Sequence, residues 1–498
     1  MNPDTTSKNI ISMNEVRKRE ENSFRNILKG TSIFGGVQVF NILISAIRLK
    51  FVAVILGPSG MGIAGLFNTA SLTIQQFASL GLNLSIVKEI GQAKENESHL
   101  ADVLASIRPL ILISALLGAL VCLLFPRTLS SITFGTADYK GAFLILSAAI
   151  FFSIAGSALM SVLQGLHAIK PLSKASLIGS LVGLIIGVPL YWLFGTEGIV
   201  PAMLVLALST CTWYLLSLKK TLKVSASAWL HEIHLPLLKK VLVMGIILMS
   251  NDLFRNLVNY LVNVYIRSQG GMDEVGFFQS CNTMTSQYSA IVFTAMAMDY
   301  LPRLSAVAGD NKKMCEIVNR QIEVVGLLIA PIACAVILLA PIVIELFQTK
   351  SFLVATPLLR LLALAVVVRA LMYPLGYIVF AKDNRRLFFW MESIGANLLT
   401  LFLTYIGYYL WGLKGLGYSA IIDCTICLCV YIAVNRHLYG YRLSAPAIKI
   451  IVFSIFASIA MTVVCFLSHG QTMWIIASIL LLTVSCITLL NFKRKLTD

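Results

Sequence analysis

The chain consists of apolar runs of about 20 residues or more, separated by short polar connections. A run of this length, folded as a helix, spans the hydrocarbon core of a bilayer. Hydrophobic residues make up 58% of the chain and charged residues 12%, whereas soluble domains carry roughly 25% charged residues. The sequence therefore predicts an all-helical integral membrane protein. We expect about 14 transmembrane helices, near 27–56, 61–90, 103–125, 141–165, 172–194, 198–218, 238–266, 274–301, 316–347, 353–381, 385–410, 414–436, 447–467 and 472–491.

A polar stripe marks the expected span 238–266. Its members recur at steps of four, three, four and four, so they share one face of a helix; they are Asp252, Asn256, Asn259, Asn263 and Arg267. Such side chains are costly in contact with lipid, so the stripe must face protein or water. The first span carries a second, weaker polar face, formed by Gln38, Asn41, Ser45 and Arg48. Two polar-faced spans predict a solvated cavity inside the bundle.

The distribution of charge predicts the topology. With a cytoplasmic N-terminus, the cytoplasmic segments hold 29 of the 39 Lys and Arg residues but also 16 of the 23 acidic residues. Basic residues collect on the cytoplasmic side of membrane proteins, so we expect both termini there. The net charge of +16 then reports topology, and nucleic acid is not an expected partner, because no soluble basic domain is present. The first 26 residues lack the apolar stretch of a signal peptide.

An internal repeat divides the chain. Gly62 is followed six residues later by Asn68, and Gly276 is followed six residues later by Asn282, an offset of 214; a second match along the chain has an offset of 212. We infer two six-helix lobes of the same orientation, as in the parallel repeats of some transporters. The expected organisation is a cytoplasmic N-terminal arm (1–26), a first lobe (27–218), a cytoplasmic interlobe linker (219–237), a second lobe (238–438), and two appended spans with a cytoplasmic tail (439–498).

Several short stretches resemble a known transporter family. They are Leu56-Gly57-Pro58-Ser59-Gly60-Met61-Gly62, Asp273-Glu274-Val275-Gly276, Tyr300-Leu301-Pro302-Arg303-Leu304-Ser305 and Gly376-Tyr377-Ile378-Val379-Phe380-Ala381-Lys382. With these stretches and the pattern of spans, the chain resembles the polysaccharide-transporter branch of the multidrug/oligosaccharidyl-lipid/polysaccharide (MOP) superfamily. The likeness is strongest to the Wzx-type O-antigen flippases.

This resemblance implies a function and a location. Two lobes would enclose a central cavity that opens alternately to each side of the bacterial cytoplasmic (inner) membrane. The substrate would be undecaprenyl-pyrophosphate-linked oligosaccharide, a surface-glycan repeat unit such as that of O-antigen in lipopolysaccharide. Membrane lipids, a glycan polymerase and a chain-length regulator are the further partners that we expect. No cofactor is implied.

The sequence also supplies candidate ligands for such a substrate. Arginine suits pyrophosphate, because its charge is fixed and its donors form a planar fork. Arg48, Arg255 and Arg369 are the phosphate candidates, and Arg369 lies near the middle of a span, where a lipid-facing Arg costs roughly 2.5–3.5 kcal/mol. Arg267 and Arg360 are further candidates that could instead snorkel to the interface. The amide candidates for sugar hydroxyls are Asn256, Asn259, Asn263, Gln38 and Asn41.

Structural roles compete with each of these assignments. Arg255 lies three residues after Asp252, so the two could form an ion pair within one helix. The three asparagines of the stripe could join helices to one another, a common role of amides in membranes. Asp423, within an apolar span, is either a proton or cation site or a paired structural acid. Asp252 has the same two interpretations.

Other functions have less support in the sequence. No phosphate-binding loop, no nucleophile elbow and no cluster of metal ligands is present, so we expect a transporter and no metal. A membrane glycan polymerase or acyltransferase usually needs a large outer loop or paired catalytic groups, and the longest expected outer loop, 126–140, has about fifteen residues. The closer alternative is a cation-coupled multidrug exporter of the same superfamily. An exporter of cations would favour an acidic and aromatic cavity over one with arginines.

Overall fold

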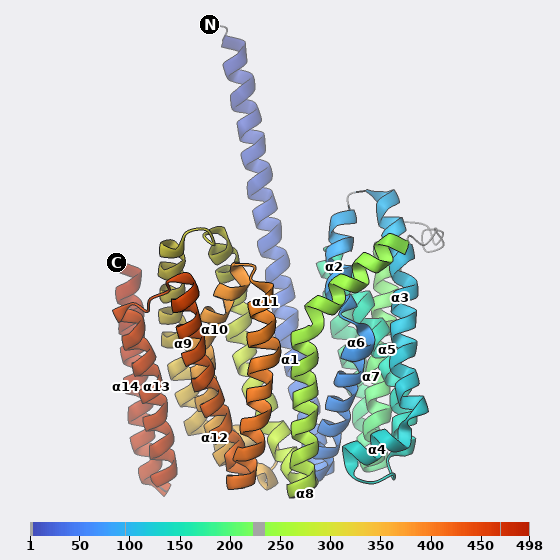
Figure 1. Ribbon diagram of the computed structural model, residues 1–498, viewed down its shortest axis with the longest axis vertical. Helices are drawn as coiled ribbons and strands as arrows, with labels where there is room; N and C mark the ends of the chain where they lie inside the picture. Colours follow the sequence, from blue (N-terminus) through green and yellow to red (C-terminus); the bar gives the residue numbers. More distant parts are fainter. Residues whose placement is uncertain (1–2, 95, 223–234, 469, 498) are drawn as a thin grey trace.

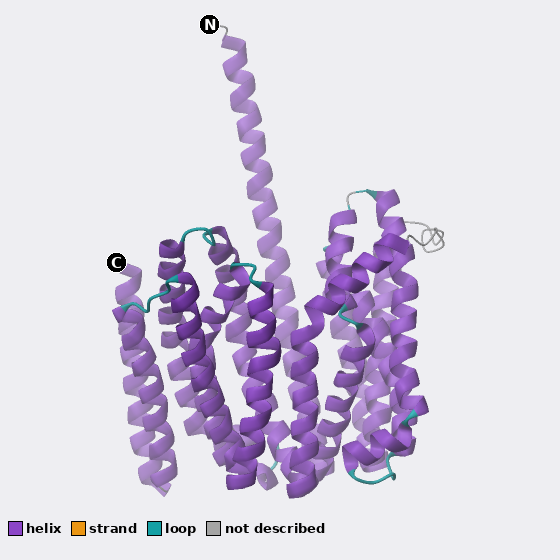
Figure 2. Cartoon of the chain, in the orientation of Figure 1, coloured by secondary structure: helices purple, strands orange, loops and turns teal. Residues whose placement is uncertain are grey.

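The computed structural model describes residues 3–94, 96–222, 235–468 and 470–497, and these residues form helices joined by short turns (Figures 1 and 2). No strand occurs in these ranges. The elements are α1 (Pro3–Ser79), α2 (Leu82–Ala93), α3 (Glu97–Leu124), α4 (Pro126–Phe134), α5 (Lys140–Gly165), α6 (Ile169–Phe194), η1 (Gly195–Gly198), α7 (Ile199–Thr221), α8 (Leu235–Ala306), α9 (Asn311–Phe347), η3 (Lys350–Ala355), α10 (Thr356–Ala381), α11 (Arg385–Phe388), η4 (Phe389–Ala396), α12 (Asn397–Tyr439), α13 (Ala445–Leu467) and α14 (Gly470–Thr497).

The expected all-helical membrane fold is confirmed. Within the described part of the chain, nine helices are long and apolar enough to cross a membrane. The count of 14 spans stays a prediction, because three pairs of expected spans run on as single helices with a sharp kink. Each kink is at a glycine with positive φ: Gly57 (φ 66°), Gly271 (φ 80°) and Gly412 (φ 55°). Only glycine adopts such a conformation without a steric cost, so the sequence places the kinks.

The helices form two groups (Figure 1). Helices α3, α5, α6 and α7 pack together on one side and α9, α10 and α12 on the other, while α1 and α8 pack along each other between the groups. Each group has its own apolar core, represented by Val162 in the first and Leu371 in the second. Helices α13 and α14 pack outside the second group, against α9. The lobe boundaries at 27–218 and 238–438 stay predictions, and most of the expected linker, 223–234, lies outside the described residues.

Helices α1 and α8 meet at their kinks through their backbones. We call this end of the bundle the kink end, and the opposite end, where α1 begins and α14 finishes, the tail end (Figure 1). A methyl group added at Gly62 would lie 2.0 Å from the carbonyl oxygen of Met272, and one added at Gly276 would lie 2.0 Å from the carbonyl oxygen of Pro58. Glycine is therefore required at both positions, which allows the helices to cross in direct contact.

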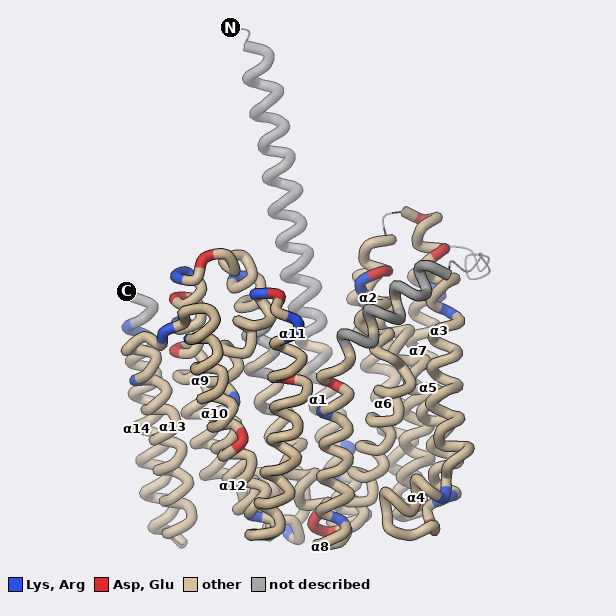
Figure 3. The backbone as a smooth tube through the Cα atoms, in the orientation of Figure 1, with Lys and Arg blue, Asp and Glu red and all other residues tan. Residues whose placement is uncertain are grey.

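Charged residues lie mainly at the two ends of the bundle, and the middle is apolar (Figure 3). Such a distribution fits an apolar band crossed by the helices and flanked by polar surfaces. The few charged residues within the band are therefore the natural starting point for the functional site. The expected cytoplasmic position of both termini stays a prediction.

Candidate functional site

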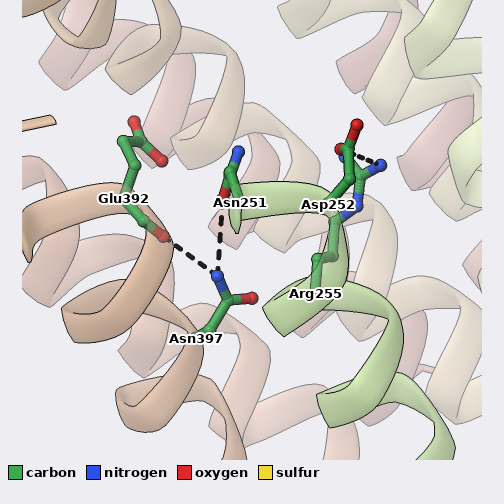
Figure 4. Close-up of polar contacts among 5 residues, drawn as sticks. All are labelled: Asn251, Asp252, Arg255, Glu392 and Asn397. Atoms are coloured by element: carbon green, nitrogen blue, oxygen red, sulfur yellow. Dashed lines mark hydrogen bonds and ion pairs between the residues drawn. The ribbon is translucent and has the colours of Figure 1, made fainter. Parts of the chain in front are cut away.

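The polar stripe of α8 has an exposed part towards the tail end. There Arg255 Nη2 lies 2.8 Å from Asp252 Oδ1, and the two side chains are 61% and 44% exposed (Figure 4). The ion pair that competed with phosphate binding is thus present. An exposed pair of this kind contributes only about 0–1 kcal/mol to stability, so Arg255 can leave Asp252 at little cost.

Towards the kink end, one member of the stripe, Asn263, is buried. Asn263 is 1% exposed; its amide donates to the carbonyl oxygen of Asn259 (2.7 Å), and its oxygen accepts from Gln279 Nε2 (2.9 Å). The side chain of Asn259 is exposed. Arg267 lies against the turn after α4, where a methyl group on Gly135 would be 2.1 Å from its Nη1. In this conformation Asn263 therefore joins two segments of α8.

The polar face of α1 contacts the first group of helices. Asn41 Nδ2 donates to Ser176 Oγ of α6 (2.8 Å). Arg48 is half-buried within electrostatic range of the Tyr191 hydroxyl. Its Nε is buried, and no hydrogen-bond partner for it occurs among the described residues. The side chain of Gln38 lies outside them. Arg48 is thus a half-buried cation with one buried donor that has no partner among the described residues.

Asn256 lies midway along the stripe and is half-buried. Its backbone carbonyl accepts a hydrogen bond from Thr73 Oγ1 of α1 (3.2 Å). This bond joins α1 and α8 where the two groups of helices face each other. This contact uses only the backbone carbonyl of Asn256, so its side-chain amide can bind a ligand.

Arg369 lies near the middle of α10 and is exposed, although its neighbours from Leu358 to Val368 are all buried. It lies within electrostatic range of the Cys424 thiol and of Asp423, both on α12. Asp423 is 8% exposed and accepts a hydrogen bond from Thr400 Oγ1 (3.0 Å). The structure thus brings together two residues that the sequence analysis treated separately.

Arg360 points away from this group, into the packing of the appended helices. It is 8% exposed. Its Nε donates to the carbonyl oxygen of Ile337 on α9 (3.1 Å) and its Nη1 to that of Cys465 on α13 (2.8 Å). These bonds connect three helices, so in this conformation Arg360 holds α13 against the second group.

Sequence reasoning missed Glu392, an acidic residue in contact with α12. Glu392 lies in η4, a π-helix, and its carboxylate accepts a hydrogen bond from the Tyr431 hydroxyl of α12. Asn397 Nδ2 donates to the carbonyl oxygen of Glu392 (2.9 Å) and approaches Asn251 Oδ1 at 3.5 Å (Figure 4). An acid within the expected span 385–410 was a usable signal, because ionisable residues in membrane spans are usually functional. π-Helices are also frequent at functional sites.

A second missed residue joins the two groups at the kink end. Lys50 of α1 donates from Nζ to the carbonyl oxygens of Glu345 (2.8 Å) and Gln348, at the end of α9. Opposite, Tyr260 of α8 shares a hydrogen bond of 2.7 Å with Thr133 of α4. Helices α1 and α8, which lie between the groups, are thus bonded to α9 and α4, respectively, and in this sense the kink end is closed. Nothing in the sequence pairs these residues.

An apolar pocket of about 230 Å³ lies between α1 and the second group of helices. Residues of α1, α8, α9 and α10 line it, among them Ile42, Leu49, Met284, Val343 and Leu359. It lies beside Gln348, close to the bond that Lys50 makes. The boundary between the groups thus combines an apolar recess with polar contacts.

Comparison with known proteins agrees with the resemblance expected from the sequence. The family model for polysaccharide biosynthesis proteins matches residues 51–357. The Lipid III flippases of Escherichia coli (strain K12) and of Shigella flexneri are each 24% identical over 363 residues, which cover 71% of this chain and 85% of each relative.

Solved structures share the fold. An inward-facing multidrug resistance transporter of the MATE family, in the MOP superfamily, has a TM-score of 0.67 at 17% identity, covering 80% of this chain and 94% of its own. The lipid II flippase MurJ, in an inward closed conformation, has a TM-score of 0.64 at 16% identity, covering 93% of this chain and 99% of its own. Because the family model matches more than half of the residues, the chain belongs to the polysaccharide biosynthesis protein family, and it has the fold of MOP superfamily transporters.

Proposed function

We propose that the protein is a flippase that moves undecaprenyl-pyrophosphate-linked oligosaccharide, the repeat unit of O-antigen or a similar surface glycan, from the inner to the outer leaflet of the bacterial cytoplasmic membrane. The observation that carries the proposal is Arg369, an exposed residue near the middle of a membrane helix whose preceding residues, Leu358 to Val368, are all buried. Asp423 lies within electrostatic range of this cation, and the pyrophosphate of a lipid-linked glycan is a second anion for Arg369, one that crosses the membrane.

The other candidates supplement this charge. Arg48 offers a free buried donor, and Arg255 can exchange Asp252 for phosphate. Asn256 and Asn259 offer amides to sugar hydroxyls, which Asn263 would join once released from Gln279. Arg267, which lies against Gly135, and Asn41, which is bonded to Ser176, already contact the first group of helices. The assignment of Gln38 rests on the sequence alone.

Transport would proceed by alternating access of the two lobes, 27–218 and 238–438. The present conformation has a closed kink end, which we assign to the outer face. The glycan head would enter from the cytoplasmic side while the prenyl chain stays in lipid, for which the apolar pocket beside α1 provides a surface. Outward movement of a bound anion is favoured by an inside-negative potential, by about 2.3 kcal/mol per charge per 100 mV fully crossed.

In this proposal both termini are cytoplasmic, and a glycan polymerase and a chain-length regulator are the expected protein partners. This mechanism needs no catalytic residue. The related Lipid III flippases, named for transport of another lipid-linked substrate, support the assignment of substrate class.

One observation favours a second function. The second lobe carries two acids in its helices, Asp423 on α12 and Glu392 in η4, as a cation-coupled multidrug exporter would require. In the flippase, the same acids could bind the coupling ion. The two functions differ in cargo, so the cargo must be measured.

The deciding experiment is deletion of the gene, followed by extraction of lipid-linked oligosaccharides. A flippase defect should accumulate an undecaprenyl-linked repeat unit on the inner leaflet and deplete surface glycan, and plasmid expression of the wild-type chain should reverse both. Unchanged glycolipids with altered resistance to cationic drugs would instead establish the exporter.

A further inference from the structure

The most informative unexplained feature is the one open face of α10. Nearly every residue of this helix from Leu358 to Val379 is buried. The open positions are Arg369, Met372, Tyr373, Gly376, Tyr377 and Phe380. Steps of three and four residues place them on one side of the helix. Arg369 begins this face, and three aromatic rings continue it towards the tail end.

The rings form a continuous surface. Tyr373 stacks on Phe293 of α8, with ring centroids 4.6 Å apart and an interplanar angle of 9°. Tyr377 stands edge-on to Tyr373 at 5.0 Å, and Phe380 edge-on to Tyr377 at 6.5 Å. Phe380 is 55% exposed. We call Phe293, Tyr373, Tyr377 and Phe380 the aromatic wall.

Hydrogen-bonding groups lie along the wall. The hydroxyls of Tyr373 and Tyr377 are 3.0 Å apart. The carboxylate of Glu392, bonded to Tyr431, faces the helix between them: a methyl group on Gly376 would be 3.2 Å from Glu392 Oε1. Glycine at this position lets a carboxylate lie close to the rings.

The wall faces the interior of the second lobe. Phe293 comes from α8, Glu392 from η4 and Tyr431 from α12, and all three converge on the same side of α10. A belt of aromatic residues at the membrane interface would instead point outwards, into the headgroup region. The wall therefore suits a ligand inside the protein.

Sugar rings match this combination of groups. A pyranose has an apolar face of C–H groups, which packs on an aromatic ring, and an edge of hydroxyls, which needs donors and acceptors such as tyrosine and carboxylate. Ligand sites generally combine an apolar, aromatic lining with a few polar groups. The eleven steps from Arg369 to Phe380 cover about 16 Å of helix, the length of a short oligosaccharide.

We propose that the aromatic wall binds the sugar rings of the substrate, while Arg369 at its deep end binds the phosphate. This inference rests on the proposed function, since it assumes an oligosaccharide as cargo, and it deepens that function by assigning the sugar-binding surface to the second lobe. The wall then recognises the shape of the sugars, and Arg369 recognises the charge of the phosphate. Substitutions can therefore remove one kind of recognition without the other.

The test measures the two kinds of binding on the purified full-length protein in nanodiscs. One probe is the repeat-unit oligosaccharide released from the host surface glycan by mild acid, without phosphate or lipid; the other is inorganic pyrophosphate. We expect Phe380→Leu and Tyr377→Leu each to weaken oligosaccharide binding about three- to tenfold and to leave pyrophosphate binding within twofold. Arg369→Gln should show the opposite pattern. Phe402→Leu is the matched control, because Phe402 is an exposed aromatic (62%) on α12.

The retained pyrophosphate binding also shows that each variant is folded, and Tyr377→Phe, which keeps the ring, should retain most of the oligosaccharide affinity. Oligosaccharide affinity that is equal in wild type and both Leu variants would overturn the wall as a sugar site. Wild-type protein that binds pyrophosphate but no oligosaccharide would overturn it too. Failure of the proposed function is distinguishable, because gene deletion would then leave lipid-linked oligosaccharides unchanged.

Discussion

Replacement of Lys50 by Met should open the kink end. The ammonium of Lys50 is the donor in two hydrogen bonds that cross from α1 to the end of α9. The last carbonyl groups of a helix have no partner within the helix and carry a partial negative charge, so a lysine there is favourable. Met has a similar length and no donor, so it removes these bonds while keeping most of the packing.

The expected size of the effect follows from these bonds. A hydrogen bond from a charged group contributes about 1.5–3 kcal/mol. Because Lys50 is half-buried and water replaces part of the loss, we take about 2 kcal/mol for the whole contact. Since 1.4 kcal/mol corresponds to a tenfold change, the ratio of closed to open kink ends should fall roughly 30-fold.

Spin labels on the two groups of helices can measure this shift. Ala137 and Ser351, both exposed, lie at the kink end on opposite sides. With both changed to Cys, and the exposed Cys429 and Cys486 changed to Ser, double electron–electron resonance reports the distance between the groups. Lys50→Met should add a population at longer distance.

Two controls accompany the measurement. Lys50→Arg keeps a charged donor and should retain the wild-type distribution, and Lys140→Met removes an exposed lysine at the same end. If Lys50→Met gives the wild-type distance distribution in folded protein, the contact does not hold the kink end closed, and our reasoning about it is wrong.

Three further predictions test charged residues of the candidate site. In surface-glycan complementation at equal protein levels, Arg369→Lys should keep part of the transport and Arg369→Gln should lose most of it, because a positive charge is needed for phosphate; equal activity of all three would remove Arg369 from the site. The charge exchange, Asp252→Arg together with Arg255→Asp, should not restore transport in the same assay, because the exposed ion pair itself contributes little. Transport that is restored by the exchange would favour a structural ion pair. Arg360→Met should lower the free energy of unfolding by roughly 2–3 kcal/mol, seen as a lower Tm, because two buried backbone bonds are lost; unchanged Tm with lost transport would place Arg360 in the substrate site instead.

The general fold was predictable, because it depends on local properties of the sequence. Apolar runs determine where helices lie, and the glycines at the kinks determine where they turn sharply. Gly57 and Gly271 both fall in short connections between expected spans. The sequence did not reveal that the helices continue through these kinks, because that depends on how the neighbouring groups hold the backbone.

The candidate site was predictable in its residue types and less so in its contacts. The stripe of α8 was visible from spacing, yet burial of Asn263 depends on Gln279, sixteen residues away. Arg360 looked like a possible ligand, and its carbonyl partners on α9 and α13 follow only from tertiary packing. Glu392 carried a usable signal that a search centred on arginine overlooked.

The contact between Gly62 and Gly276 has the pattern of an isologous dimer interface, in which residue i of one subunit touches residue j of the other and j touches i. Here Gly62 approaches Met272 and Gly276 approaches Pro58, and each member of these pairs lies 214 residues from its counterpart. Such reciprocity is what two copies of one ancestral half would leave after fusion into a single chain. It also means that a substitution at either kink acts on both halves at once, so neither half can evolve its crossing angle alone.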